Sequence, residues 1–407
     1  MSLWARQFKV LGNRPVSILW GGLALSAIGD EFYKVALVWL GASLIGADAG
    51  YLSAIQAAAT LIFSLSVGIW ADSWDHRRTM IGADCLRGLL VLIPVGLALS
   101  QPLSIWMLVP VAVLVPGLSA FFEPALQSSI PVLVRSKDQL GAINGLFEAT
   151  RRMARLVGPS LIGLLAPIIS VIHFFTLDAL TFFLSAVAVF SLRRDLPRTP
   201  AQSANPAGRS LRASFAGGFL ALRGHPLLQY ALYTSGVVNG VWQVGFVLGV
   251  ALALQQQQPG DIGAFGMVIA AYGGGSLLSN MLVGSLRSYA PAVLMFAGRM
   301  IGGMGFIGLS VAPNPAAALG LAALMGFGAP MSNIPILNLL QSTFPRTEIG
   351  PVYRVKMVSE WGCILVALLI APSLFRALGV QWVIALCGMI VLSVGGVGWF
   401  KFARVKR

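Results

Sequence analysis

The chain has 407 residues, of which 57% are hydrophobic and only 10% are charged. Soluble domains carry about 25% charged residues, so this composition excludes an ordinary soluble protein and indicates an integral membrane protein. The net charge of +14 does not indicate nucleic-acid binding, because the basic residues follow the loops of a membrane topology rather than one surface.

About a dozen apolar runs are each long enough to cross a hydrocarbon core of about 30 Å as a helix. The predicted spans begin near residues 16, 50, 79, 105, 140, 171, 227, 262, 291, 315, 352 and 380. The first run is too long and too charged for a signal peptide, so we expect it to stay as the first helix. The sequence thus predicts an all-α membrane protein with 12 transmembrane helices.

The distribution of basic residues predicts the orientation. With a cytoplasmic N-terminus, the inner segments hold 19 of the 28 Lys and Arg residues, and the outer loops hold only Arg376. The positive-inside rule therefore predicts cytoplasmic N- and C-termini in a bacterial-type inner membrane.

The spans fall into two six-helix bundles, predicted at residues 1–192 and 227–400, before a basic tail at 401–407. Residues 193–226 read as a cytoplasmic linker rich in Pro, Ser, Gly and Arg. Its second half places Leu211, Phe215, Phe219 and Leu222 at helical spacing, which predicts an amphipathic helix on the inner membrane surface.

The two halves resemble each other weakly. Gly117, Pro124 and Arg135 recur at a constant offset of 211 as Gly328, Pro335 and Arg346. Six spans on each side and this repeat favour a duplicated architecture, which is typical of transporters with a central site between the halves.

The stretch GIWADSWDHRRTM, Gly68 to Met80, resembles the signature of the major facilitator superfamily between its second and third helices, G-x-L-a-D-r-x-G-R-[KR]. Trp70 and Asp75 depart from that pattern. Asp75 stands where the second Gly is usual, as in the branch of macrolide and siderophore exporters. The G-D step at Asp30, the stretch EPALQSSIPVLV from Glu123, the N-G-L step at Asn144 and the late stretch from Gln341 to Gly350 are also similar to that branch.

The resemblance implies a conformational latch made by Gly68, Asp72, Arg77 and Arg78. Asp72 is predicted to end the second helix, and the two arginines begin the third, where they can make charge-assisted hydrogen bonds and engage helix ends. A solvated turn is the alternative. The corresponding stretch GSLRSYAPAVL from Gly284 contains no acidic residue, so a second latch is not expected.

The stretch GPSLIG in the fifth span is similar to the antiporter motif G-P-x-x-G-G, with Ile162 in place of a Gly. The resemblance implies an antiporter role for Gly158, Pro159 and Gly163. A packing kink is the alternative, since Pro159 frees a carbonyl and the glycines let a neighbouring helix come close.

Three charged residues, Asp30, Glu31 and Lys34, lie near the middle of the first span. Each central charge costs roughly 2.5 to 3.5 kcal/mol on insertion scales, so they are expected to face protein or a cavity. Asp30 and Glu31 lie four and three residues from Lys34 and can pair with it. We predict that one acid, first of all Asp30, titrates during proton transport, whereas a purely structural ion cluster is the alternative.

The fifth span carries a stripe of Glu148, Arg152 and Arg155, flanked by Arg151, that cannot face lipid. One interpretation pairs Glu148 with Arg152 and the other arginines with Asp30, Glu31, Glu123 or Asp178. The other has an unpaired arginine, or Lys34, bind a carboxylate or phosphate of the cargo.

The acids and bases predicted to lie in spans are nearly balanced, six against seven, which disfavours a pump for lipophilic cations and favours anionic or zwitterionic amphiphiles. Five of the six acids lie in the first half, where coupling is therefore placed, with Asp30, Glu31, Glu123, Glu148 and Asp178 as proton-coupling candidates. The seventh span offers uncharged candidates for an amphipathic cargo pocket, Tyr233, Asn239, Trp242 and Gln243, although ordinary helix packing explains them nearly as well.

No G-x-x-x-x-G-K-[ST] phosphate loop is present, so ATP is not expected as the direct energy source, and no cofactor other than a proton gradient is predicted. The Cys and His residues stand alone, and no metal site or enzymatic activity is expected. The favoured function is a monomeric proton-coupled antiporter that exports a siderophore or a macrolide-like drug by alternating access. A lysophospholipid transporter is the alternative, and a membrane enzyme or receptor is the most distant one.

Overall fold

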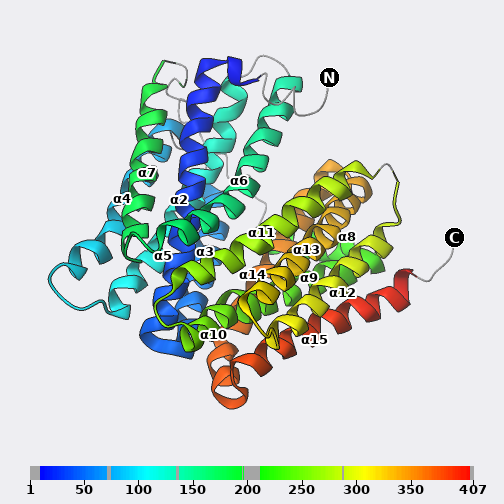
Figure 1. Cartoon of the computed structure of the whole chain (residues 1–407). Helices are drawn as coiled ribbons and strands as arrows, with labels where there is room; N and C mark the ends of the chain where they lie inside the picture. The colour runs from blue at the N-terminus through cyan, green and yellow to red at the C-terminus, as the bar shows by residue number, and fades with distance from the viewer. Residues whose placement is uncertain are drawn as a thin grey trace. The chain divides into compact units, whose positions relative to one another are not determined.

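The computed structural model describes residues 10–70, 75–133, 137–194, 196, 211–286 and 288–403, and these residues are entirely helical apart from turns. Six long helices come first (Figure 1): α2 (Arg14–Ile45), α3 (Ala49–Trp70), α4 (His76–Ala98), α5 (Ile105–Ser129), α6 (Lys137–Leu165) and α7 (His173–Ser191). Short 3₁₀ turns lie at η1 (Val10–Gly12), η2 (Gly46–Asp48) and η4 (Ile130–Leu133).

The second half begins with the short helix α8 (Leu211–Leu222). Next, α9 (Pro226–Trp242) continues through a π-helical segment, η5 (Gln243–Leu248), into α10 (Gly249–Gln257). The remaining helices are α11 (Ile262–Ser285), α12 (Pro291–Ser310), α13 (Pro315–Thr343), α14 (Arg346–Leu378) and α15 (Val380–Gly398), which ends in the π turn η6 (Trp399–Ala403). All twelve predicted starting points lie within six residues of a helix start.

Among the described residues, ten helical stretches are long and apolar enough to cross a membrane, and the first of them, Arg14–Ser66, covers α2 and most of α3. The helix α6 is not among them, because its charged residues lie close together. The chain divides into two compact units, one formed by 1–44 with 59–206 and the other by 45–58 with 207–407. The helix α8, predicted as part of a linker, thus belongs to the second unit.

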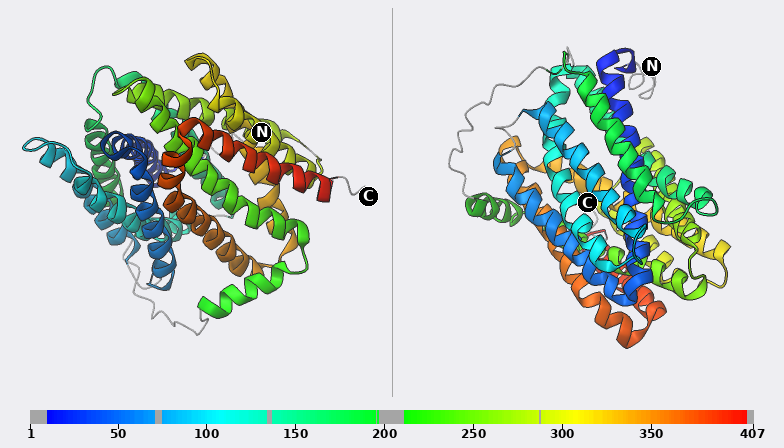
Figure 2. Two further views of the ribbon diagram at one scale, coloured as in Figure 1. Left: turned by 90° about the horizontal axis from the view of Figure 1, so that it is seen from below. Right: turned by 90° about the vertical axis from the view of Figure 1, so that its left-hand side faces the viewer.

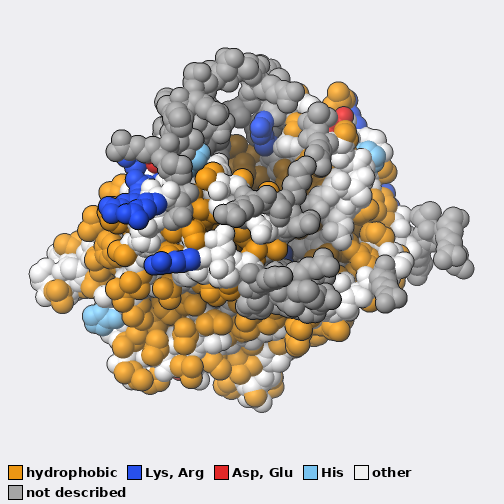
Figure 3. Space-filling view, turned by 90° about the horizontal axis from the view of Figure 1, so that it is seen from above, with side chains coloured by type: hydrophobic (Ala, Val, Ile, Leu, Met, Phe, Trp, Pro, Cys, Tyr) orange, Lys and Arg blue, Asp and Glu red, His pale blue; other side chains and the backbone are white. Residues whose placement is uncertain are grey.

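The helix α4 shows why the chain suits a lipid environment. Its charged residues Asp84 and Arg87 are buried, whereas large apolar residues on the other face are exposed: Leu86, Leu89, Ile93 and Leu97. A soluble helix has the opposite arrangement, with apolar residues inside and charges outside. Hydrophobic side chains also dominate the described surface in Figure 3, with few Lys and Arg. The exposed apolar faces are therefore interpreted as lipid-facing.

In the first unit, α4 packs along both α5 and α7, and α4 and α7 lie side by side in Figures 1 and 2. Gly88 of α4 lies against the ring of Phe183 on α7, where a Cβ atom would come within 2.8 Å of the ring. The α2 residue Tyr33 donates its hydroxyl hydrogen to the carbonyl oxygen of Val111 on α5 at 3.2 Å. These contacts hold the charged faces of four helices around one interior.

In the second unit, glycines let α11, α12 and α13 touch through their backbones. A Cβ atom added to Gly275 would overlap the carbonyl oxygen of Ala323, and one added to Gly326 would overlap that of Tyr272. Such close approach between small residues is a common basis of helix association in membranes, where apolar burial adds little.

We expect Gly326→Val to lower the free energy of unfolding by at least about 3 kcal/mol, because the new side chain overlaps backbone that cannot yield. Thermal unfolding of the purified protein in detergent measures the effect. Gly320→Val is the matched control, since Gly320 lies in the same helix with open space around it. Equal losses in both variants would contradict close packing at Gly326.

The segment predicted as an amphipathic helix is helical, as α8, and packs onto α14. Gly218 lies against the carbonyl oxygen of Pro351, and the ring of Phe219 stacks on that of Tyr233 with centroids 6.4 Å apart. Phe219 and Leu220 are exposed. The location of α8 on a membrane surface stays a prediction.

Candidate functional site

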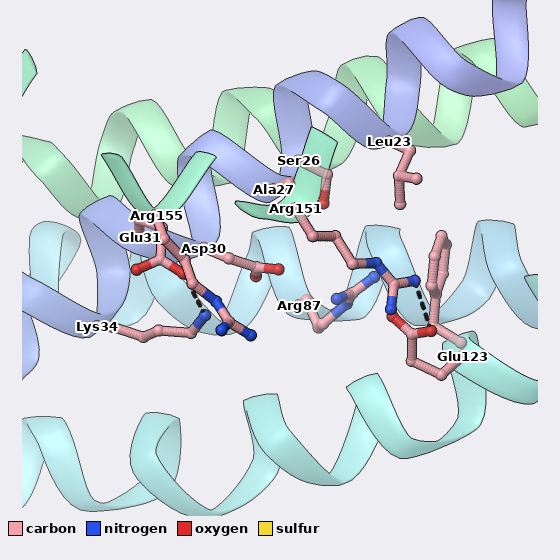
Figure 4. A pocket seen from close by; sticks show the side chains of 11 residues that line it. Leu23, Ser26, Ala27, Asp30, Glu31, Lys34, Arg87, Glu123, Arg151 and Arg155 are labelled. Atoms are coloured by element: carbon pink, nitrogen blue, oxygen red, sulfur yellow. Dashed lines mark hydrogen bonds and ion pairs between the residues drawn. The ribbon is translucent and has the colours of Figure 1, made fainter. Parts of the chain in front are cut away.

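A charged cavity of about 150 Å³ lies within the first unit, between α2, α4, α5 and α6. Figure 4 shows its lining residues: Leu23, Ser26, Ala27, Asp30, Glu31, Lys34, Arg87, Phe122, Glu123, Arg151 and Arg155. Seven of these eleven side chains are Asp, Glu, Lys or Arg, and such ionisable groups are costly at membrane depth and mark a functional site rather than inert packing.

In the first span, the charges of Asp30, Glu31 and Lys34 are only partly neutralised by an ion pair within this group. Lys34 Nζ lies 2.7 Å from Glu31 Oε1, so the predicted local ion pair with Glu31 is confirmed. Asp30 is half-buried, and its carboxyl group points into the cavity between that pair and Arg87 (Figure 4). No other described residue donates a hydrogen bond to Asp30. Asp30 is therefore the acid of α2 that remains available for other chemistry.

Glycines on α2 explain why this helix can present charges inward. A Cβ atom at Gly22 would lie 3.0 Å from that of Ala188 on α7, and one at Gly29 would lie 2.7 Å from Oδ1 of Asp178 on the same helix. The close approach of α2 and α7 places Asp30, the residue after Gly29, near Asp178 of α7.

The arginines of α6 separate into paired and unpaired groups. Arg151 Nη2 lies 2.7 Å from Glu123 Oε2 of α5, and Arg152 Nε lies 2.9 Å from Glu148 Oε1. The pairing of Glu148 with Arg152 was predicted, and this pair does not line the cavity. Arg155 lines the cavity, is exposed, and forms no ion pair with any residue that the structure describes. Its guanidinium is the cavity cation with free hydrogen-bond donors.

Two buried charged residues of α4 were not among the predicted site residues. Asp84 and Arg87 of α4, 0% and 3% exposed, form an ion pair. Arg87 also donates to Ser119 Oγ at 3.2 Å, and its guanidinium carbon lies 4.7 Å and 4.4 Å from the ring centroids of Phe122 and Phe182. The signal was the spacing of Asp84 and Arg87 by three residues inside the third predicted span. Adding one acid and one base leaves the predicted charge balance of the spans unchanged.

Asp178 of α7 is 0% exposed, and neither of its carboxyl oxygens has a hydrogen-bond partner among the described residues. The hydroxyl group of Thr181, one turn away, donates to the backbone oxygen of Asp178 instead. Asp178 does not line the cavity but lies behind Asp30, against Gly29.

The predicted latch is only partly within the described residues, because Asp72 lies outside them. Gly68 falls in the last turn of α3, and Arg77 and Arg78 lie in the first turn of α4. The side chain of Asp75 caps α4 by accepting a hydrogen bond from the backbone amide of Arg78 at 3.0 Å. The departure from Gly at this position therefore has a local role as a helix cap.

The motif GPSLIG lies within α6, with Pro159 inside the helix. A Cβ atom added to Gly158 would lie 2.6 Å from Cβ of Glu31 on α2, so α6 and α2 touch directly beside the cavity. Gly163 follows one turn later on the same helix. The close approach that the packing interpretation requires is thus present at Gly158.

The polar candidates of the seventh span are not among the residues that line the cavity. Tyr233 and Asn239 lie in α9, Trp242 ends it, and Gln243 begins η5. The Trp242 ring packs against Phe246 and Tyr272, and its Nε1 hydrogen has no acceptor among the described residues. These residues belong to the second unit, whereas the cavity belongs to the first.

The second unit has a buried arginine of its own. Arg299 of α12 is 2% exposed and donates only to neutral groups: the hydroxyl oxygens of Ser332, Thr234 and Ser235 and the backbone oxygen of Ala231, at 2.5 to 3.2 Å. It ties α12 to α9 and α13.

A two-part helical membrane fold with a charged interior cavity defines a membrane transport protein. The model of the Major Facilitator Superfamily matches residues 19–355, and the chain belongs to this family. The resemblance found in the sequence is thereby confirmed.

Relatives point to an efflux branch. Macrolide efflux protein A of Streptococcus pyogenes is 21% identical over 92% of this chain and 93% of its own length. An uncharacterized MFS-type transporter, YfiS, of Bacillus subtilis is 24% identical over 91% and 89%, and the multidrug efflux pump Tap of Mycobacterium tuberculosis is 28% identical over 48% of each chain. A POT family transporter in complex with 5-aminolevulinic acid shares the fold, with a TM-score of 0.73 at 12% identity over 97% of both chains.

Proposed function

We propose that this multi-pass membrane transporter is a proton-coupled exporter of amphipathic small molecules that works by alternating access. Twelve spans with both termini in the cytoplasm of a bacterial-type cell complete the proposed topology. The names of the relatives, macrolide efflux protein and multidrug efflux pump, support export of a drug-like cargo. Proton coupling takes place in the cavity of the first unit, where Asp30 is not paired with a described cation.

The same cavity favours an anionic or zwitterionic cargo. Among its lining cations, Lys34 pairs with Glu31, Arg87 with Asp84, and Arg151 with Glu123. Among these cations, Arg155 alone has no ion-pair partner in the part of the chain that the structure describes, so its N–H groups are available as hydrogen-bond donors. A guanidinium group is well suited to a carboxylate or phosphate, which it can bind through two parallel hydrogen bonds.

Proton flux in liposomes tests the proposed function. Purified wild type and Asp30→Asn are offered a carboxylate siderophore, a macrolide and a lysophospholipid. We expect at least one cargo to drive proton movement in the wild type, and Asp30→Asn to abolish it, because the amide cannot exchange a proton. Asp261→Asn is the control, since Asp261 only caps α11 at an exposed position.

Lysophospholipid movement without proton flux, unchanged in Asp30→Asn, would overturn proton coupling. It would make Asp30, Glu31 and Lys34 a structural ion cluster and the chain a lipid carrier.

A further inference from the structure

The carboxyl group of Asp178 is the most completely isolated acid in the described part of the first unit. It is 0% exposed, and both oxygens lack a hydrogen-bond partner among the described residues. Two acids of the cavity differ from it, because Glu31 and Glu123 each pair with a cation at 2.7 Å. Asp30, the third, differs by being only half-buried and facing the cavity. Burying an ionised carboxylate without a partner costs several kcal/mol, so Asp178 is stable here as the neutral, protonated acid.

The charged groups that face Asp178 come from two helices. Asp30 and Lys34 face it from α2, and Asp84 and Arg87 face it from α4. Both cations are already engaged, Lys34 by Glu31 and Arg87 by Asp84 and Ser119. The two other acids add repulsion. No neighbouring cation is therefore free to hold Asp178 in its ionised form in this conformation.

A short route joins this acid to the cavity. Gly29 has no side chain, so the Asp178 carboxyl group lies directly against the α2 backbone, where a Cβ atom would come within 2.7 Å of Oδ1. The next residue, Asp30, points into the cavity (Figure 4). A proton that leaves Asp178 can therefore bind the carboxylate of Asp30 before it reaches the cavity.

We propose that Asp178 stores the transported proton and that Asp30 exchanges it with the cavity. In the step itself, the O–H bond of the Asp178 carboxyl group breaks and the proton binds a carboxylate oxygen of Asp30. Asp178 becomes a carboxylate, and Asp30 becomes the neutral acid that faces the cavity. This proposal rests on the proton-coupled export proposed above and names the group that holds the proton.

The second unit supplies an internal comparison. Arg299 donates to Ser332, 33 residues later, as Arg87 donates to Ser119, 32 residues later. Phe296 stands three residues before Arg299, where Asp84 stands three residues before Arg87. The second unit thus repeats the arginine and serine without the acids, so the acid cluster around Arg87 is specific to the first unit.

Infrared spectroscopy of the full chain in liposomes at neutral pH tests the proton site without any cargo. Wild type is expected to show the carbonyl stretch of a protonated carboxyl group, and Asp178→Asn is expected to lose it. Glu360→Gln is the control and keeps the band, because Glu360 is ion-paired with Lys356 at 2.7 Å. Asp178→Glu keeps a shifted band, which separates loss of the acid from misfolding.

Persistence of the band in Asp178→Asn, or its loss in Asp30→Asn instead, would overturn the assignment to Asp178. In the liposome transport assay, Asp178→Asn is expected to retain cargo exchange and to lose proton-driven accumulation. A wild type that shows the Asp178 band but no cargo-driven proton flux would refute the proposed coupling while leaving a neutral buried acid, so the two failures are distinguishable.

Discussion

Replacing Arg87 by Met is expected to lower the free energy of unfolding by about 3 to 5 kcal/mol, because it leaves Asp84 as a buried charge without its partner. The guanidinium also fills the space between the rings of Phe122 and Phe182. Thermal unfolding of the purified protein in detergent measures the loss. Replacing Asp84 by Val in the same chain is expected to recover most of it, since both charges are then gone.

Arg299→Met is the matched control for Arg87→Met. Removing the Arg299 side chain leaves no acid without its partner, because Arg299 donates to hydroxyl and backbone oxygens. The hydroxyl groups of Thr234 and Ser235 keep their own hydrogen bonds to backbone oxygens of their helix. We expect a loss of only about 1 kcal/mol, because losing the charge-assisted hydrogen bonds is largely offset by removing a buried guanidinium charge. Equal losses at Arg87 and Arg299 would show that helix cross-linking, and not the orphaned charge, governs stability at both sites.

Replacing Arg155 by Gln is expected to raise the KM for an anionic cargo about 10- to 100-fold. A hydrogen bond to a charged group contributes about 1.5 to 3 kcal/mol, and each 1.4 kcal/mol corresponds to a factor of ten. Because Arg155 has no ion pair to lose within the described residues, its removal breaks none of the protein's own ion pairs. Initial transport rates in liposomes over a range of cargo concentrations supply the KM.

Arg152→Gln is the control on the same helix, since Arg152 is occupied by Glu148 and lies outside the cavity lining. Its KM should stay within about twofold of wild type. If both variants raise KM alike, the effect comes from the general positive charge of α6. If neither does, the cargo is not held through its anionic group at Arg155.

Much of the fold was predictable because a membrane forces long apolar runs to become helices. The predicted starts at 105, 262, 291, 315 and 380 coincide with helix starts, and even the amphipathic segment 211–222 is a helix. Local ion pairs were predictable as well, since residues three or four apart on a helix must lie on one face. Lys34 with Glu31 and Arg152 with Glu148 are examples.

Partners on different helices were not predictable in the same way. The pairing of Arg151 with Glu123 was one of several combinations that spacing left open. The sequence shows that Asp178 has no cation three or four residues away on its own helix. Whether a neighbouring helix supplies a partner depends on which helices pack together, and in the described residues none does. Asp84 and Arg87 have the spacing of a local pair, but only the packing of α4 against α5 and α7 shows that both side chains are buried.

The π-helical segment η5 marks the point at which the seventh span would change register if the segment rewound. A π turn holds one more residue than an α turn, so rewinding η5 as α-helix would rotate α9 by about 100° relative to α10 and slide it by about 1.5 Å. Gly245 and Gly249 lie within η5 and at its end, closely packed on Cys387 and Ile384 of α15, which anchors one side of the segment. Such a one-residue shift would change the direction in which the side chains of Asn239 and Gln243 point relative to α10.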